Sequence, residues 1–353
     1  MNIIIIIAFL NFILLQTGFC QVRIDKLSCG SFSRPIHYLF GRADPKLKYM
    51  LYTRSNAKDA CDLQPTEKAY RMCNFNPKVK TAIIVHSWIP KLEECYPMFD
   101  LKDKLLQADD YNVVMLNWTA YSNTHDYTSS RPANYGIAAT YSFTVGIKFS
   151  SWLHFLQVHG GADANKIHLI SHSLGAAVCH FAAKYICNLG RITYLDAAAP
   201  LFTSLPEYLQ PSNTDADFVE SIHTNGAFTA GKGYGYLQPI SDIDYYPNGG
   251  QMQPKCVYGS KYKSGNGKIY WVKSLSTQIS CNHAMSYIYY IASFNKTCKF
   301  LGRICDSYED FTAGKCSSGP VCRMGFYSKK LPNLSAKSKC FLETSDMPPF
   351  CLE

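Results

Sequence analysis

The chain has 353 residues, a hydrophobic content of 47%, a formal net charge of +9 and 15 cysteines. That hydrophobic content is enough for a large buried core and excludes an intrinsically disordered chain. The cysteines indicate an oxidising compartment, in which disulfides persist and nucleic acid is not an expected partner. The positive charge favours adsorption to anionic surfaces such as phospholipid.

An apolar run over residues 3–15 is too short to span a bilayer comfortably, and small or polar residues follow it. We therefore expect a secretory signal over residues 1–20 and a single secreted domain over 21–353. The region before the run lacks the usual Lys or Arg, which leaves a retained N-terminal anchor as the alternative. Removal of Cys20 leaves an even number of cysteines, which can pair completely. Predicted glycosylation acceptors, which fit secretion, are Asn117, Asn295 and Asn333.

Short β-branched runs alternate with longer segments of helical period, a pattern typical of an α/β fold with parallel strands. Apolar residues recur every three or four positions from Ile137 to Leu156, which predicts a helix that covers the sheet. Buried strands read as continuous apolar runs. The predicted strands are 81–85, 113–117, 166–170, 192–196 and 218–223.

Glycine, tyrosine and lysine dominate from about residue 226, and closely spaced glycines predict a surface loop over 226–244. Beyond Cys298 the cysteines crowd together, which predicts a disulfide-rich extension of the same domain over 298–353. We find no internal repeat and no linker rich in Pro, Ser or Gly, so a second domain is not expected. The spacing C-x-x-C is absent, which disfavours a zinc site, and we predict no metal and no other cofactor.

A strand, a tight turn and the start of a helix meet at Ser173. The predicted strand 166–170 ends at a turn with the sequence Ser171-His172-Ser173-Leu174-Gly175. Such a nucleophile elbow forces the serine backbone into a strained conformation, so small residues are needed beside it. A hydroxyl is a weak nucleophile until a base takes its proton, and the base needs an orienting carboxylate. The pattern therefore predicts Ser173 as a nucleophile and requires a histidine and an acid elsewhere.

Chain order identifies the partners, because α/β-hydrolases carry these groups in the order Ser, Asp or Glu, His. Asp196 ends the fourth predicted strand and is the candidate orienting acid. His283 follows the loop region and is predicted to open a helix, which makes it the candidate base. The candidate oxyanion donors are the backbone N–H groups of Leu174, directly after the nucleophile, and of Trp88, after the first predicted strand. Three other histidines are predicted to hold loops by hydrogen bonding: His86, His172 and His223.

Six segments have the order and spacing of one known family. They are Val85-His86-Ser87-Trp88, the elbow, Leu195-Asp196, Asp217-Phe218-Val219-Glu220-Ser221-Ile222-His223-Thr224, Asp244-Tyr245-Tyr246-Pro247-Asn248-Gly249-Gly250 and Cys281-Asn282-His283. In these segments the chain resembles the pancreatic lipase family, in particular its insect neutral lipases and phospholipases A1. The resemblance implies an α/β-hydrolase fold, with a central, mostly parallel sheet flanked by helices. It also assigns the catalytic triad and the oxyanion hole to the serine, acid, base and two N–H donors named above.

By the same resemblance, disulfides join Cys256 to Cys281 and Cys305 to Cys316, while the other pairings stay open. The chain ends shortly after Cys351. The resemblance therefore implies that the C-terminal β-sandwich domain of the vertebrate lipases is missing and that colipase is not a partner.

Several positions depart from the family pattern. Ser171 replaces the first glycine of the elbow, and Ala197 replaces a proline after the acid. Ser87 replaces a glycine beside the oxyanion donor, which misplaces that donor if the position requires a positive φ. The calcium loop of the family is matched only in part, so calcium is not predicted; its residues here are Glu207, Ser212 and Asp215.

The loops over 256–281 and 226–244 occupy the places of the family's lid and of a neighbouring loop, and both have full length. By the same resemblance, full-length loops imply a preference for triacylglycerol. The lid interleaves aromatic residues with lysines, which favours an interfacial element for lipid with anionic headgroups, while a surface loop without function is the alternative. The predicted interface residues are Tyr270, Trp271, Val272 and Leu275.

The leading hypothesis is a secreted acyl hydrolase that releases fatty acid from triacylglycerol through an acyl-enzyme at Ser173. Hydrolysis of the sn-1 ester of phospholipids, the reaction of a phospholipase A1, is the first alternative. An inactive lipid-binding or yolk-like storage protein is the alternative of another class. The complete set of Ser173, Asp196 and His283 argues against an inactive protein.

Overall fold

The computed structural model describes residues 44–89, 91–92, 95–123, 131–227, 231–263 and 269–352, so the predicted signal over 1–20 lies outside the described residues. The strands are β1 Lys48–Tyr52, β2 Cys61–Asp62, β3 Lys80–Val85, β4 Tyr111–Asn117, β5 Ile167–His172, β6 Arg191–Leu195, β7 Phe218–Ile222, β8 Ile243–Pro247, β9 Lys261–Lys263, β10 Ile269–Trp271, β11 Leu301–Ile304, β12 Val321–Arg323 and β13 Ser338–Leu342. The α-helices are α3 Glu67–Met72, α4 Tyr96–Ala108, α5 Thr119–Ser122, α6 Arg131–Val158, α7 Gly175–Ala183, α8 Leu275–Ala292 and α9 Tyr308–Thr312.

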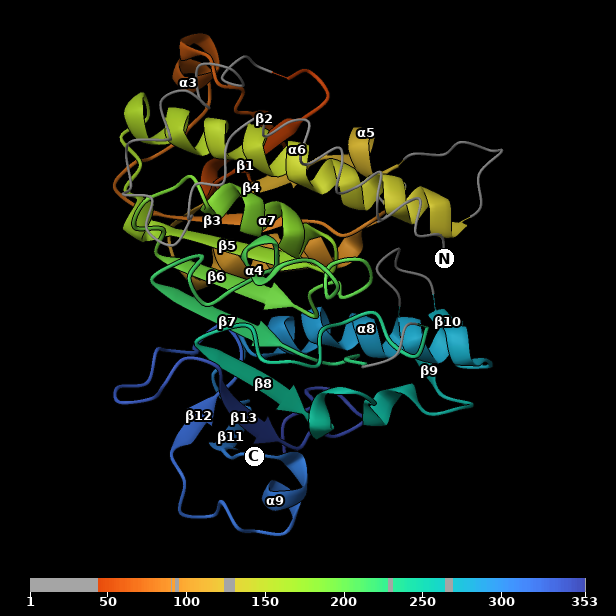
Figure 1. Ribbon diagram of the computed structural model, residues 1–353. Coiled ribbons are helices and arrows are strands. Elements are labelled where there is room, and N and C mark those ends of the chain that lie inside the picture. Colours follow the sequence, from red (N-terminus) through yellow and green to blue (C-terminus); the bar gives the residue numbers. More distant parts are fainter. Residues whose placement is uncertain are drawn as a thin grey trace.

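One large sheet organises the molecule, with its strands in the order β12-β11-β13-β8-β7-β6-β5-β3-β4-β1-β2. Neighbours from β13 to β4 pair in parallel, whereas the strands at the two edges pair antiparallel. The five predicted strands form β3 to β7, with ends shifted by one or two residues. This sheet and its flanking helices have the α/β-hydrolase architecture that the sequence predicts (Figure 1).

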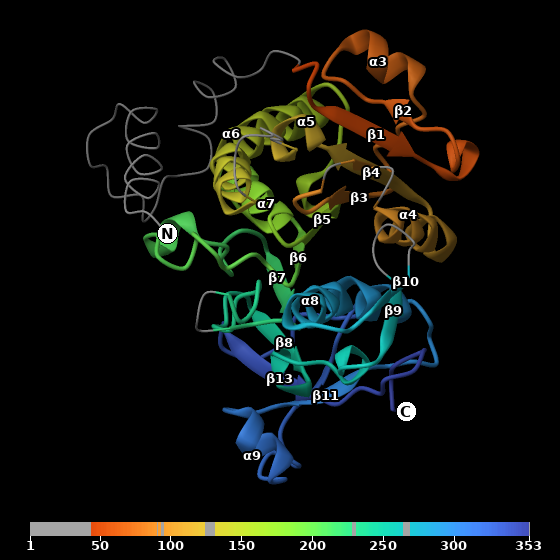
Figure 2. The ribbon, with the colours of Figure 1, turned by 90° about the vertical axis from the view of Figure 1, so that its right-hand side faces the viewer.

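Helices cover both faces of the sheet, because buried parallel strands present apolar side chains on each side. α6 and α7 lie over one face, and α4 and α8 lie over the other (Figure 2). An apolar core lies between each face of the sheet and the helices that cover it. Trp152 of α6 is buried in the first core, and Tyr289 of α8 is buried in the second. The two layers hold the carboxyl ends of the parallel strands at one edge, where ligand sites of such sheets form.

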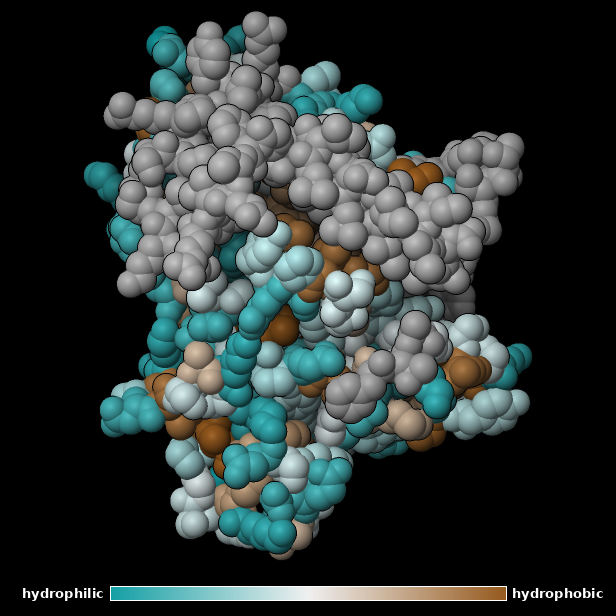
Figure 3. All heavy atoms as spheres, viewed as in Figure 1, coloured by the Kyte–Doolittle hydropathy of each residue, from teal (hydrophilic) through white to brown (hydrophobic). Residues whose placement is uncertain are grey.

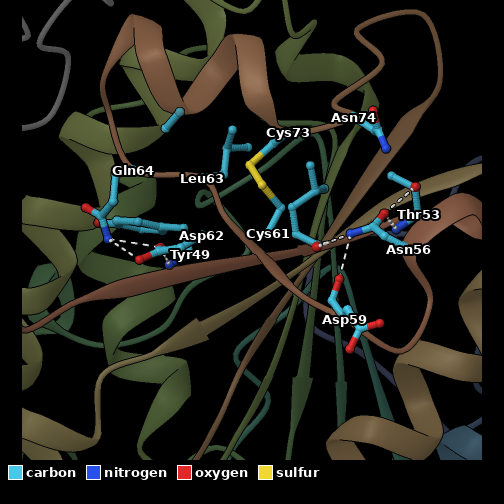
Figure 4. The surroundings of a disulfide bond; sticks show 12 residues. Tyr49, Thr53, Asn56, Asp59, Cys61, Asp62, Leu63, Gln64, Cys73 and Asn74 are labelled. Carbon is cyan, nitrogen blue, oxygen red and sulfur yellow. Dashed lines mark hydrogen bonds between the residues drawn. A yellow bond between two sulfur atoms is a disulfide. The ribbon is translucent and has the colours of Figure 1, made fainter.

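A disulfide between Cys61 and Cys73 fastens the first edge of the sheet (Figure 4). It links β2 to the residue after α3, while the Asn56 side chain donates hydrogen bonds to the Leu51 and Asp59 carbonyls. The Asp62 side chain accepts the backbone N–H of Tyr49 in β1 at 3.2 Å. These contacts fix the short edge strands, which have little hydrophobic area of their own.

The cysteine-rich C-terminal segment continues the large sheet. β13 pairs in parallel with β8, and the described disulfides of this segment join Cys298 to Cys351, Cys305 to Cys316 and Cys322 to Cys340. Complete pairing of the cysteines, which the even count allows, does not occur: Cys95 and Cys179 are free and buried thiols. Cys179 lies in the core of one sheet face and Cys95 in the core of the other, and each packs as a small hydrophobic residue.

Two features differ from the sequence-based expectations. The helix that carries His283 does not open at this residue but at Leu275, so His283 lies within it. The Ser274 hydroxyl caps the helix by accepting the Thr277 N–H at 3.3 Å. The predicted loop 226–244 ends in β8, whose sequence Ile-Asp-Tyr-Tyr-Pro has no continuous apolar run. None of the helices in the described ranges is long and apolar enough to cross a membrane.

Candidate active site

Ser173 lies in the turn between β5 and α7, with a φ of 55°. Non-glycine residues rarely adopt this left-handed region, and it persists only where neighbours fix the backbone. Here the Ser173 N–H donates to the Leu195 carbonyl at 3.1 Å, and the Ser173 carbonyl accepts the Ala198 N–H at 3.2 Å. The elbow is therefore held by the end of β6, the strand that leads to the candidate acid.

The close approach of α7 to β3 explains the glycine after the elbow. A Cβ on Gly175 would lie 2.6 Å from the Val85 carbonyl oxygen and 2.7 Å from that of His86. No such constraint requires a glycine at Ser171, which lies within β5 and pairs with Val85 and Tyr194. A serine in place of the first glycine of the elbow therefore fits here, because position 171 is a regular strand position.

Asp196 and His283 form the hydrogen-bonded pair that a serine nucleophile needs. The His283 Nδ1 lies 2.5 Å from Asp196 Oδ2, and the other carboxylate oxygen accepts the N–H groups of Thr224 at 2.9 Å and Asn225 at 3.0 Å. Asp196 is fully buried, whereas the His283 side chain keeps 12% of its surface exposed. A carboxylate on Nδ1 leaves Nε2 unprotonated and able to accept a proton.

The loop after β7, whose N–H groups donate to Asp196, also requires a glycine, which the sequence interpretation does not identify. A Cβ on Gly235 would lie 2.3 Å from Asp196 Oδ1, and the Gly235 N–H donates to the Asn225 carbonyl at 3.0 Å. The spacing of Gly231, Gly233 and Gly235 was the available signal, but a glycine-rich run does not reveal which residue packs on a carboxylate.

The candidate oxyanion donors lie at the expected ends of β5 and β3. Leu174 is the N-cap of α7, and no described residue accepts its N–H. The loop before Trp88 is tied to β4: His86 donates from Nδ1 to the Ser87 carbonyl at 2.7 Å and accepts the Trp118 N–H at Nε2. Ser87 is not among the described residues with positive φ, so serine meets no backbone strain at this departure from the family pattern.

Three buried histidines should make the fold acid-sensitive. Burial lowers the pKa of His86 to about 4 and holds the pKa values of His168 and His172 well below 6.5. Unfolded histidines take up protons below pH 6.5, so the free energy of unfolding should fall from pH 6.5 to about 4. For His86 alone the loss is about 3 kcal/mol, at about 1.4 kcal/mol per pH unit. Thermal melts followed by circular dichroism should give a lower Tm at pH 4.5 than at pH 7.

Two variants identify the source of this acid sensitivity. His168 donates from Nε2 to the Thr193 hydroxyl at 2.7 Å, and His168→Gln retains a donor there without a titrating ring. This variant should lose part of the pH dependence of Tm, whereas His159→Gln on the surface should retain all of it. A wild-type Tm that stays constant or rises from pH 7 to pH 4.5 would contradict the prediction.

The residues of the partial calcium loop already have cationic partners. Asp215 is fully buried, and its carboxylate accepts from His180 Nδ1 at 2.9 Å and lies 3.3 Å from the Lys184 ammonium. Glu207 pairs with Lys337 at 2.8 Å. Among the described residues, no group of three or more His, Cys, Asp or Glu could hold a metal ion. This donor set does not fit calcium, because lysines already balance the negative charge that a cation would balance.

The predicted lid forms a β-hairpin followed by the first turns of α8, closed by the disulfide between Cys256 and Cys281. Trp271 is 46% exposed and Leu275 is 63% exposed, whereas Val272 is fully buried in the core. In this structure Val272 therefore packs in the core and anchors the hairpin, and its predicted contact with an interface stays a prediction. The side chain of Tyr270 lies outside the described part of the chain.

The predicted glycosylation acceptors differ in accessibility. Asn295 and Asn333 are exposed, whereas Asn117 is only partly exposed at the end of β4. Asn117 and Asn295 both accept the N–H and hydroxyl of the threonine two residues on, so this contact does not distinguish them and exposure alone does. Accessibility therefore favours the first two sites.

Comparison with known proteins places this site in a family. Residues 35–350 match the family model described as Lipase. The chain is 31% identical to mouse pancreatic triacylglycerol lipase over 346 residues, covering 94% of the chain and 72% of that protein. It is 32% identical to rat pancreatic lipase-related protein 2, covering 92% and 69%, and 31% identical to mouse inactive pancreatic lipase-related protein 1, covering 94% and 71%. The chain therefore belongs to the pancreatic lipase family of α/β-hydrolases, and this membership supports a lipase or carboxylic ester hydrolase.

Proposed function

We propose that the protein is a secreted hydrolase that releases fatty acids from lipid esters through an acyl-enzyme on Ser173. The observation that carries the proposal is the 2.5 Å contact between His283 Nδ1 and Asp196 Oδ2, beside an elbow in which Ser173 has a φ of 55°. An inactive relative exists at 31% identity, so overall similarity alone does not decide activity. The arrangement of these side chains favours an active enzyme over an inactive lipid-binding protein.

Each group has one role in the proposed cycle. His283 Nε2 takes the Ser173 hydroxyl proton while the serine oxygen attacks the ester carbonyl, and the Leu174 and Trp88 N–H groups bind the resulting oxyanion. Collapse of the tetrahedral intermediate expels the alcohol, which receives the proton from His283. Water, deprotonated by the same imidazole, then attacks the acyl-enzyme and releases the fatty acid.

Triacylglycerol is the proposed substrate class, with the sn-1 ester of phospholipids as the alternative. Support comes from the full length of the lid and of the loop over 226–244. Fatty-acid release should be measured on triacylglycerol emulsions and on phosphatidylcholine vesicles labelled at the sn-1 chain. Faster release from the emulsion is expected. Faster release from the vesicles would identify a phospholipase A1, and no release from either would favour the inactive lipid-binding protein.

We further propose that the lid contacts lipid surfaces with anionic headgroups. Lys261 and Lys273 lie 4.3 and 5.8 Å from the Trp271 ring, and hydrophobic residues lie at the surface near this hairpin (Figure 3). No acidic residue occurs between Asp244 and Asp306, so no local carboxylate in the sequence offsets the lysines. An exposed aromatic ring flanked by lysines matches a negatively charged interface.

Neutralising these lysines should weaken adsorption. Lys261→Gln together with Lys273→Gln should reduce binding to vesicles that contain phosphatidylserine by about 10- to 30-fold, at about 1 kcal/mol for each lysine near the surface. The loss should shrink as salt is raised, because salt screens exposed charges. The control is Lys58→Gln with Lys68→Gln, which removes the same charge near β2 and α3, away from the lid (Figure 1). Equal binding of the lid variant and wild type in vesicle sedimentation would refute the contact.

A further inference from the structure

Two aromatic rings contact the imidazole of His283. The His172 ring centroid lies 4.5 Å from that of His283, at an interplanar angle of 41°. The Tyr234 ring centroid lies 5.4 Å away and is nearly perpendicular, at 82°. His172 is the last residue of β5, and Tyr234 lies in the loop between β7 and β8, so the two rings come from separate parts of the chain.

We infer that His172 and Tyr234 are positioning residues that clamp the His283 ring in the orientation required for proton transfer between Ser173 and the substrate. The inference rests on the proposed function, since it assigns His283 as the base. Asp196 fixes one ring nitrogen, but a single hydrogen bond leaves the imidazole able to tilt about that contact. Rings from two directions restrict this tilt, which matters because His283 must transfer a proton in both halves of the cycle.

His172 is anchored by its own contacts. It is buried, its Nε2–H donates to the His283 carbonyl at 3.3 Å, and its ring packs edge-on against Tyr287 at 5.0 Å. Burial, together with the charge of His283, holds the pKa of His172 well below 6.5. His172 therefore stays neutral when His283 is protonated, so it supports the imidazolium without competing for the proton.

Tyr234 is fixed by the loop that also orients Asp196. Its N–H donates to the Asn225 side chain at 2.9 Å, and its carbonyl accepts the Ala199 N–H at 2.8 Å. Asn225 in turn donates its N–H to Asp196, and Gly235 packs on the same carboxylate. One loop thus places both a donor on the acid and a ring against the base, which couples the positions of Asp196 and His283.

Removal of the Tyr234 ring should also change the pH profile of kcat/KM. The described titratable side chains around His283 are Asp196, His172, Tyr234 and, behind His172, Tyr287. Loss of the ring alters how His283 is held against Asp196, so the acid limb of the profile should move. A purely structural role would lower Tm without moving this limb.

The test uses paired variants on the full secreted chain with a soluble ester, p-nitrophenyl butyrate. Tyr234→Leu and His172→Leu, which remove the rings, should each lower kcat by about 10- to 100-fold, with little change in KM, because a misplaced catalytic group slows the chemical step. Tyr234→Phe and His172→Phe, which retain a ring at each position, should each recover much of that loss. His168→Gln is the matched control, since it alters another buried histidine, and its kcat should equal that of wild type.

A spectroscopic readout separates this inference from the proposed activity. The Nδ1 proton between His283 and Asp196 should give a low-field ¹H NMR resonance in wild type, and this resonance should broaden or shift in Tyr234→Leu and His172→Leu even if no ester is hydrolysed. An unchanged resonance and pH profile in folded variants would overturn the clamp. Absence of Ser173-dependent hydrolysis in wild type would instead overturn the proposed function, and the resonance would still decide the clamp.

Discussion

Replacing Ser173 by alanine is expected to lower kcat for ester hydrolysis by on the order of 10⁶-fold, the size of effect seen when a serine hydrolase loses its nucleophile. The alanine removes only the oxygen that forms the acyl-enzyme, while the hydrogen bonds that hold the elbow involve backbone groups. Tm should therefore change little. Release of p-nitrophenol from a soluble ester measures the loss without a lipid interface.

Ser204→Ala is the matched control, because Ser204 is an exposed serine whose hydroxyl donates to the Leu201 carbonyl. Its kcat should equal that of wild type. A Ser173→Ala protein that folds and still hydrolyses ester within about tenfold of the wild-type rate would contradict the nucleophile assignment.

Replacing Asp196 by asparagine is expected to lower kcat by about 10⁴-fold, because an amide cannot hold His283 in the tautomer that accepts the serine proton. The introduced amide would retain a carbonyl oxygen for the Thr224 and Asn225 N–H groups, so the loop should stay in place. The acid limb of the pH dependence of kcat/KM, measured on the same soluble ester, should change as well.

Gly235→Ala provides an independent check on the acid, because it changes no catalytic atom. Its Cβ would lie 2.3 Å from Asp196 Oδ1 and must displace either the carboxylate or the loop. We expect a fall in kcat of about 100-fold, since a displacement of about 1 Å has that effect. Normal kcat in both Asp196→Asn and Gly235→Ala would show that another acid orients His283.

Local signals explain why the elbow could be predicted from the sequence. A strand, a turn and a helix follow one another around Ser173. Gly175 is required because the helix that starts there packs closely against the end of β3, and an elbow of this kind needs small residues at such a contact. Asp196 can be predicted for a related reason, because it directly follows β6, whose sequence Arg-Ile-Thr-Tyr-Leu is mostly apolar and is buried from its second residue onward. The parallel strands β3 and β4 contain continuous apolar runs, which are typical of strands buried on both faces, whereas β7 includes Glu220 and Ser221.

The contacts that complete the site depend on distant parts of the chain. Tyr234 meets His283 only because the loop after β7 folds over Asp196, and no local pattern predicts that fold. The start of α8 differs from the prediction because its cap, Ser274, lies inside the segment predicted as lid. The burial of Val272 has no local signal, because the residue follows a strand of only three residues, which is too short for alternation to show which side faces the core.

Covalent labelling with a fluorophosphonate, followed by peptide mass spectrometry, tests the nucleophile most directly. The reagent reacts with a serine hydroxyl only where a base and an oxyanion hole activate it. We expect one adduct per chain, located on Ser173, with labelling abolished in Ser173→Ala and slowed in Asp196→Asn. A folded wild-type protein that takes up no label, or that carries the label on another residue, would contradict the proposal that Ser173 is the activated nucleophile.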